Sequence, residues 1–250
     1  MPLTDHRPPL IMLHGFPSSA WILQPYVDAL GSERRTWAFD LPGMGDSSPH
    51  PSAKPLLTDL ATSVLEAADA LALPTFDLYG TLTGARVAME LAIAAPSRVR
   101  RLILDEPGGL PHDDPDFLTR YIPDLEPDAQ GSQFSRVFAF CRDAYVWFPW
   151  YRQTIATQRN FEDMPTPAML HSKTMEILKS TQLAVVFDSS VRHDTRARAP
   201  FIRVPTLTTD ALATLIPGAR SIALPRIEAT SATPADLAAR LAAFREFLAA

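Results

Sequence analysis

The chain has 250 residues, of which 46% are hydrophobic, and it carries a formal net charge of -5. A chain of this length and composition can bury one substantial core, so we expect one domain with an insertion. The charges are spread without a basic block, which argues against nucleic acid or an anionic membrane surface as the main partner.

Targeting and redox signals are sparse. The segment 1–15 has no basic stretch followed by an apolar run and a small-residue cleavage site, so it does not resemble a secretory signal. No stretch approaches the roughly 20 apolar residues of a membrane span. The single cysteine, Cys141, cannot form an internal disulfide, and it makes no metal-ligand pattern with the scattered histidines. We therefore expect a cytoplasmic protein without a metal or another cofactor.

Strand and helix patterns alternate along most of the chain. Strand patterns occupy 9–13, the start of 36–48, 75–80, 98–107, 204–209 and 221–225, and helix patterns occupy 20–30, 56–73, 84–95 and 234–248. This alternation predicts an α/β fold with a doubly wound, mostly parallel sheet and helices on both faces.

The segment 108–200 breaks the alternation and is rich in aromatic residues. We interpret it as an inserted, mostly helical cap, and we assign 1–107 and 201–250 to the core. Cap aromatics are more often packing residues than ligand contacts. The underside of a cap must nevertheless be lined, so we expect some of Trp147, Trp150 and Tyr151 to face a pocket. Arg142 and His171 are candidates for polar contacts there, with solvent exposure as the alternative.

The pentapeptide Gly80-Thr81-Leu82-Thr83-Gly84 stands between a predicted strand and a predicted helix. This context is typical of the nucleophile elbow G-x-S-x-G, in which glycines relieve crowding and the central residue projects into the pocket. Both glycines are present, and a leucine stands where the nucleophile would be.

Four segments in the order expected carry a resemblance to a known family: HGFPSSAW (14–21), FDLPGMGDSS (39–48), GTLTGARVAMELA (80–92) and IPGARSIALP (216–225). Together they resemble the α/β-hydrolase superfamily over nearly the whole chain. The resemblance implies an α/β-hydrolase fold with the insertion as its cap. Only about eight residues precede the first predicted strand, so we expect a shortened N-terminus that lacks the family's leading β-hairpin.

The resemblance also implies three catalytic positions, and the sequence departs from the family at each. Leu82 has no lone pair with which to attack. The base position lies near Ala229, and no histidine follows residue 193. Asp210 could stand in for the acid, although a helix N-cap is the role we favour for it. We therefore expect a member that lacks the Ser-His-Asp triad and does not hydrolyse esters by that route.

Other features of the site are retained. The resemblance implies that the backbone N–H groups of Phe16 and Thr83 form an oxyanion hole, because backbone donors do not depend on the side chain. His14 is expected to hold its loop by hydrogen bonds, and Trp21 is counted with the pocket residues. Thr81 and Thr83 lack an adjacent base, so we interpret them as hydrogen-bond donors or turn residues.

Glu106 is the candidate catalytic residue. Side chains alternate along a strand, so Glu106 is expected to face the pocket and Asp105 the opposite side. A carboxylate at the floor of an apolar pocket can act as a general acid or base. Capping a turn or pairing with an arginine is an equally good interpretation.

Three functions fit these residues. The first is a non-hydrolytic enzyme that catalyses a cyclisation, isomerisation or elimination of a bulky, apolar small molecule. Analogy alone suggests natural-product biosynthesis as its setting, with polyketides as one class of substrate. The second is a non-catalytic ligand-binding protein. The third is a hydrolase with a relocated mechanism, for example water activated by Glu106. We favour the first, and a homodimer stays an open alternative.

Overall fold

The computed structural model describes residues 7–108, 116–159, 164–209, 211–224 and 234–249. Its described strands form one parallel sheet in the order β2-β1-β3-β4-β5-β6. The strands are β1 (Leu10–Leu13), β2 (Thr36–Phe39), β3 (Phe76–Thr81), β4 (Val99–Asp105), β5 (Thr206–Thr208) and β6 (Arg220–Ser221). The predicted α/β-hydrolase fold with its doubly wound parallel sheet is confirmed.

The helices follow the predicted alternation with small shifts of their ends. In the core they are η1 (Ala20–Leu23), α1 (Gln24–Gly31), α2 (Leu57–Ala70), α3 (Thr83–Ala94), η4 (Ala211–Thr214) and α9 (Pro234–Ala249). Between β4 and β5 they are α4 (Phe117–Arg120), α5 (Ser132–Val146), η2 (Ile155–Thr157), α6 (Pro167–Leu178), α7 (Leu183–Arg192), α8 (Thr195–Arg198) and η3 (Ala199–Phe201). The two last strands are shorter than the patterns predicted. None of the described helices has both the length and the apolar character needed to cross a membrane.

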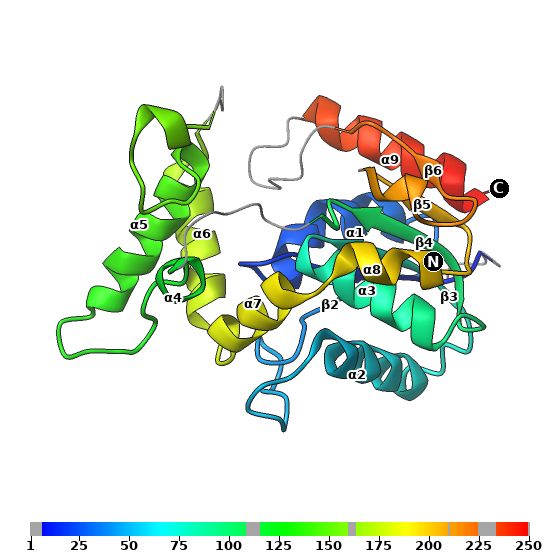
Figure 1. The fold of residues 1–250 in the computed structure, drawn as a ribbon, viewed down its shortest axis with the longest axis horizontal. Helices are drawn as coiled ribbons and strands as arrows, with labels where there is room; N and C mark the ends of the chain where they lie inside the picture. Colours follow the sequence, from blue (N-terminus) through cyan, green and yellow to red (C-terminus); the bar gives the residue numbers. More distant parts are fainter. Residues whose placement is uncertain (1–6, 109–115, 160–163, 210, 225–233, 250) are drawn as a thin grey trace.

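The sheet is covered on both faces by apolar helices (Figure 1). On one face Tyr26 of α1 and Phe244 of α9 pack on Tyr79 of β3, with the Tyr79 and Phe244 ring centroids 5.2 Å apart. On the other face α2 and α3 cover alternate residues of the same strands, such as Leu78 and Leu102. Burial on both faces explains why the sequence of β1, LIML, is continuously apolar rather than alternating.

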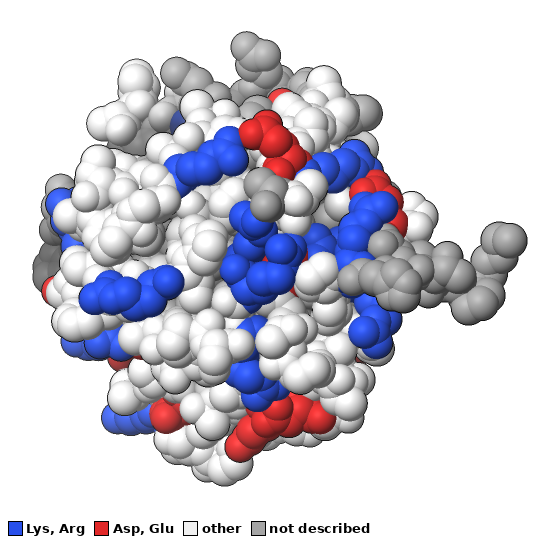
Figure 2. All heavy atoms as spheres, turned by 90° about the vertical axis from the view of Figure 1, so that its right-hand side faces the viewer, with Lys and Arg blue, Asp and Glu red and all other residues white. Residues whose placement is uncertain are grey.

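Helices α4 to α7 form a group beside the sheet, at the left of Figure 1. They follow β4 and precede β5 in the chain, so the insertion is mostly helical, as its sequence predicts. The boundaries that we assign to the cap, 108 and 200, stay a prediction. On the face away from these helices, basic side chains occur in separate groups, several of them beside acidic side chains (Figure 2).

A buried ion pair joins the central sheet to the last helix. Asp105, at the end of β4, pairs with Arg240 of α9, and both side chains are almost fully buried. Asp105 also accepts a hydrogen bond from the Tyr79 hydroxyl at 2.8 Å and one from Thr209 Oγ1 at 3.2 Å. Desolvation raises the pKa of Asp105, and Arg240 opposes that rise. Because Asp105 faces α9, the next residue is directed to the opposite side of the sheet.

A second buried cluster attaches α7 and α8 to α3. Glu90 of α3 lies 2.8 Å from Nε2 of His193 and accepts two hydrogen bonds from the Arg198 guanidinium at 2.7 and 2.8 Å. Burial raises the pKa of Glu90, but the hydrogen bonds from His193 and Arg198 outweigh it and lower the pKa to about 2. Ionised Glu90 therefore holds the end of the insertion on the core.

The Asp105–Arg240 pair is tested by a double-mutant cycle. Asp105→Asn should lower the free energy of unfolding by about 3–5 kcal/mol, because it leaves a buried guanidinium without its charged partner. Arg240→Met should cost a similar amount, and the double variant should lose clearly less than the sum of the two. Urea unfolding of the four proteins measures the cycle, and strictly additive losses would contradict the coupling.

The Glu90 cluster predicts a pH-dependent stability difference. The folded-state pKa of Glu90 is depressed from 4.5 to about 2, so its stabilising contribution is complete above the unfolded pKa and is lost as the pH falls toward the folded one. Glu90→Gln should therefore be less stable than the wild type at pH 7, and the gap should narrow between about pH 5 and pH 2. Urea midpoints across that range measure it. The exposed Glu66→Gln of α2 is the control and should show no gap.

Candidate active site

The turn between β3 and α3 has the crowded geometry of an elbow. A Cβ at Gly80 would lie 2.2 Å from the Gly84 carbonyl oxygen, and one at Gly84 would lie 2.4 Å from the carbonyl oxygen of His14. Leu82, between them, has φ 51° and ψ -115°, a conformation that costs an L-residue about 1–3 kcal/mol. Its N–H donates to the Asp105 carbonyl at 2.9 Å. The predicted requirement for both glycines follows from this close approach.

Leu82 places an alkyl group at the pocket-facing position of the elbow. Its side chain lines the cavity and packs on Gly15, where an added Cβ would lie 2.9 Å from both Cβ and Cδ1 of Leu82. The position that would carry a nucleophile therefore forms part of an apolar wall.

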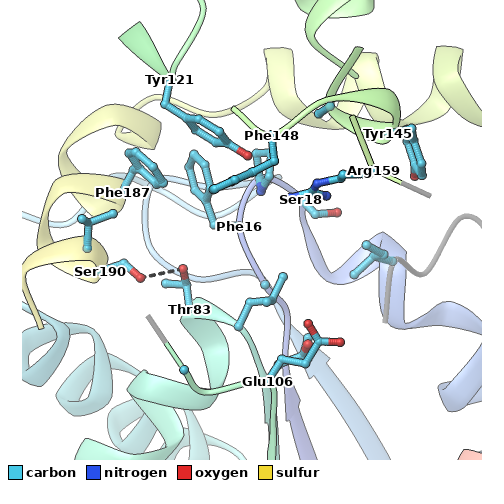
Figure 3. Close-up of a pocket in the computed structure, with 18 of the residues that line it drawn as sticks. Phe16, Ser18, Thr83, Glu106, Tyr121, Tyr145, Phe148, Arg159, Phe187 and Ser190 are labelled. Atoms are coloured by element: carbon cyan, nitrogen blue, oxygen red, sulfur yellow. Dashed lines mark hydrogen bonds between the residues drawn. The ribbon is translucent and has the colours of Figure 1, made fainter. Parts of the chain in front are cut away.

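A cavity of about 730 Å³ lies between the sheet and the inserted helices. Phe16, from the loop after β1, stacks on Phe187 of α7 with ring centroids 4.5 Å apart, and Tyr121 stacks on the same ring at 5.0 Å. Figure 3 shows these rings and Phe148 on one side of the cavity, above Thr83 and Glu106. A cavity of this size and lining suits a small organic molecule with a large apolar body.

The expected oxyanion donors border this cavity. Phe16 and Thr83 both line it, and neither of their N–H groups has an acceptor among the described residues. The Thr83 N–H opens helix α3, where the first turn has no acceptor within the helix and the helix dipole favours negative charge. Two backbone donors are thus available next to Leu82.

A buried arginine stands behind these donors. Arg86 of α3 donates through Nε to the Pro107 carbonyl at 3.0 Å, through Nη2 to the Gly108 carbonyl, and through Nη1 to O and Oγ of Ser190 at 2.6 and 2.7 Å. Burial lowers the pKa of Arg86 to about 10, so the guanidinium stays charged at neutral pH. Within the described residues it has neutral acceptors and no carboxylate partner.

A chain of two hydrogen bonds connects the Arg86 guanidinium to the Thr83 hydroxyl through Ser190. Ser190 Oγ lies 2.8 Å from Thr83 Oγ1 (Figure 3). Since Ser190 Oγ accepts from Arg86, its own hydrogen is free to bond Thr83 Oγ1, and the Thr83 hydroxyl can then donate into the cavity. Neither Arg86 nor Ser190 was predicted from the sequence. An arginine within the mostly apolar segment GARVAMELA does, however, indicate a buried charge.

Glu106 lines the floor of the cavity, below the aromatic rings and Thr83 in Figure 3. It follows β4 with φ 52°, and its N–H donates to Thr209 Oγ1 at 2.8 Å. The direction of the side chain agrees with the strand alternation expected for Glu106 and Asp105. Its catalytic role stays a prediction.

No histidine among the described residues lines the cavity. His14 lies behind the loop rather than in the pocket, with Nδ1 2.9 Å from the Gly15 carbonyl and Nε2 accepting the Leu41 N–H at 3.1 Å. Burial lowers the pKa of His14, so the ring is a neutral tether for its loop. His171 is exposed on α6 instead of lining the pocket. Asp210 and Ala229, the expected acid and base positions, lie outside the described residues.

The cap residues chosen from the sequence are not among those that line the cavity, and each has contacts within the insertion. Trp147 forms a backbone bridge with Gln158, and Arg142 pairs with Asp143 at 2.6 Å. Trp150 donates to the Tyr121 carbonyl at 2.8 Å, and Tyr151 packs under the Arg120 guanidinium at 4.4 Å. Trp21, in η1, is likewise absent from the lining. The aromatic cap residues that do line the cavity are Tyr121, Phe140, Tyr145, Phe148 and Phe187.

Two small polar side chains complete the description of the cavity wall. Thr81 lines the cavity and is almost fully buried, and its Oγ1 has no hydrogen-bond partner within the part of the chain that the structure describes. Cys141 also lines it, and burial raises the pKa of its thiol, so the protonated form prevails. Among the described residues, no group of three or more His, Cys, Asp or Glu is placed to hold a metal ion.

This chain is similar in sequence to parts of longer proteins. Human (Lyso)-N-acylphosphatidylethanolamine lipase is 35% identical over 115 residues, which are 44% of this chain and 33% of the lipase. The dihydrolipoyllysine-residue acetyltransferase component of the acetoin cleaving system of Pseudomonas putida is 30% identical over 196 residues, 76% of this chain and 48% of that protein. The match thus spans less than half the length of either relative.

Solved structures match the chain almost from end to end. The enol-lactonase of Burkholderia xenovorans superposes with a TM-score of 0.70 at 18% identity, over 98% of this chain and 93% of the enzyme. Epoxide hydrolase A of Mycobacterium thermoresistibile gives a TM-score of 0.73 at 17% identity, over 98% and 92%. These likenesses concern the fold. The family profile described as alpha/beta hydrolase fold matches residues 8–145, more than half of the 250 residues, and the chain therefore belongs to that family.

Proposed function

We propose that this chain is a non-hydrolytic member of its family, an enzyme that binds a bulky carbonyl compound and promotes its isomerisation, elimination or cyclisation without a covalent intermediate. The observation that carries the proposal is the alkyl side chain of Leu82 at the pocket-facing position of the elbow. An alkyl group cannot form an acyl-enzyme. The lack of a histidine among the described lining residues supports the same conclusion.

The donors beside Leu82 suit a carbonyl oxygen. In the proposed reaction the N–H groups of Phe16 and Thr83 and the hydroxyl of Thr83 polarise that oxygen and stabilise the negative charge that develops on it. The buried charge of Arg86, two hydrogen bonds away, strengthens the hydroxyl donor. These donors need no nucleophile to be useful.

Glu106 supplies the proton transfer. It is the one carboxylate among the described lining residues. Its carboxylate takes a proton from the carbon next to the polarised carbonyl, and the electron pair of that C–H bond forms an enolate. The donors at the elbow then bind the enolate oxygen through hydrogen bonds. Return of the proton to a different carbon gives an isomer, and departure of a β-substituent gives an elimination product.

The natural-product setting expected from the sequence receives no support from the relatives. Their names describe a lipase and an acetyltransferase component. The proposal therefore stops at the reaction class. A hydrolase with water activated by Glu106 is the alternative that these names favour, and a binding protein without catalysis is the other.

Ester hydrolysis separates the first alternative. The wild type and Leu82→Ser should both leave 4-nitrophenyl butyrate to hydrolyse at the buffer rate, and neither should react with a fluorophosphonate. The reason is that none of the described residues that line the cavity is a histidine that could activate an oxygen at position 82. A serine esterase assayed in parallel shows that the conditions support hydrolysis. Wild-type turnover that disappears in Glu106→Gln would instead establish the relocated hydrolysis.

Exchange of α-protons for deuterium tests the proposed chemistry without the natural substrate. The probe is 2-acetylnaphthalene in deuterium oxide, followed by proton NMR at a concentration where line broadening shows that it binds. The wild type should speed the exchange of the methyl protons, and Glu106→Gln should lower the enzymatic rate by roughly 100-fold or more. Thr83→Val should lower it less, and Glu66→Gln should leave it unchanged. Binding without any enzymatic exchange would favour the non-catalytic alternative.

A further inference from the structure

The cavity has a second polar end, formed by the inserted helices. Lys173 of α6 lines the cavity, with Nζ 4.9 Å from the centroid of the Tyr145 ring. Lys173 makes no hydrogen bond or ion pair with the described residues. An ammonium group carries three donors, so this end of the cavity has unused hydrogen-bonding capacity.

Ser18 adds a buried hydroxyl to the same end. Its side chain lines the cavity and is 2% exposed, and Oγ has no hydrogen-bond partner among the described residues. A buried polar group without a partner destabilises the fold, so its presence in a cavity wall points to a ligand that satisfies it. In Figure 3 Ser18 lies beside Arg159 and near Tyr145, away from the Thr83–Ser190 pair and from Glu106.

The charges that line the cavity are unbalanced. Among the described lining residues the cations are Arg86, Arg159 and Lys173, and the one anion is Glu106. Arg86 donates four hydrogen bonds to neutral oxygens of the protein. The Arg159 guanidinium lies 4.7 Å from the centroid of the Phe148 ring. Positive charge in a partly desolvated cavity attracts an anion, and the ammonium of Lys173, which has no hydrogen-bond or ion-pair partner among the described residues, is available to bind one.

We infer that the ligand carries an anionic oxygen group, a carboxylate or a phosphate, that binds Lys173 Nζ and Ser18 Oγ. Its apolar body lies against the aromatic wall of Phe16 and Phe148. The carbonyl then faces the elbow at the other end, which deepens the proposed function by naming an anionic carbonyl compound as the substrate class. That last step rests on the proposed function, whereas the anion subsite does not.

A matched pair of fluorescent probes tests the subsite. The anionic probe is 1-anilinonaphthalene-8-sulfonate, and the neutral one is N-phenyl-1-naphthylamine, which has the same ring system without the sulfonate. Lys173→Met should raise the Kd of the anionic probe roughly tenfold, the value of one charge-assisted hydrogen bond, and change that of the neutral probe less than about twofold. Ser18→Ala should act in the same direction with a smaller effect.

The control variant is Lys54→Met, which removes an exposed lysine from a loop outside the cavity and should change neither Kd. Displacement of the anionic probe by 1-naphthoate or by 1-naphthyl phosphate, weakened in Lys173→Met, supports the subsite, and the tighter competitor identifies the acid. Equal losses for both probes, or no loss for the anionic one, would overturn it.

The subsite and the proposed function fail independently. Exchange of the neutral ketone reports on Glu106 and the donors at the elbow, whereas the difference between the Kd values of the two probes reports on Lys173 and Ser18. If the wild type shows no enzymatic exchange but still prefers the anionic probe, the proposed chemistry is rejected and the anion subsite is kept. If the wild type exchanges the ketone protons but Lys173→Met weakens both probes equally, the anion subsite is rejected and the proposed chemistry is kept.

Discussion

The site depends on the lack of space where β3 turns into α3. Neither Gly80 nor Gly84 has room for a Cβ, because each faces backbone atoms at little more than 2 Å from that position. The chain can pass through so tight a turn only if the residue between them adopts a positive φ, which Leu82 does. That conformation directs its side chain into the cavity, which Thr83 also lines. The elbow is therefore a property of backbone packing and does not require a nucleophile.

The end of β4 connects this turn to the rest of the core. Asp105 accepts the Leu82 N–H with its backbone carbonyl and pairs with Arg240 through its side chain. The next residue, Glu106, is also held at a positive φ and lines the floor of the cavity. Strained backbone persists where the surroundings over-determine it, and such residues gather at functional sites. The two residues 105 and 106 thus bind the Leu82 backbone, place a carboxylate in the cavity wall and attach α9 to the sheet.

Local sequence patterns predicted what local physics decides. Alternating strand and helix patterns located the parallel sheet, the two glycines located the elbow, and the period of a strand separated Glu106 from Asp105. The contacts made across long stretches of chain had no such signal. Arg86 meets Ser190 across 104 residues, and Glu90 meets His193 across 103. Which cap aromatics line the cavity is likewise decided by how the insertion folds back, since Trp150 bonds Tyr121 across 29 residues.

The two polar ends of the cavity would select one orientation of an anionic carbonyl compound. An anionic group placed at the floor would meet the carboxylate of Glu106 in a partly desolvated space, where like charges repel strongly. The same group placed at the Lys173 end would gain an ammonium donor and the hydroxyl of Ser18. With the anion fixed there, the apolar body would lie against Phe16 and Phe148, and the carbonyl would be the part of the molecule left to meet the donors. Orientation would then follow from charge before any chemistry begins, and a leucine at the elbow would add apolar contact without competing for the carbonyl carbon.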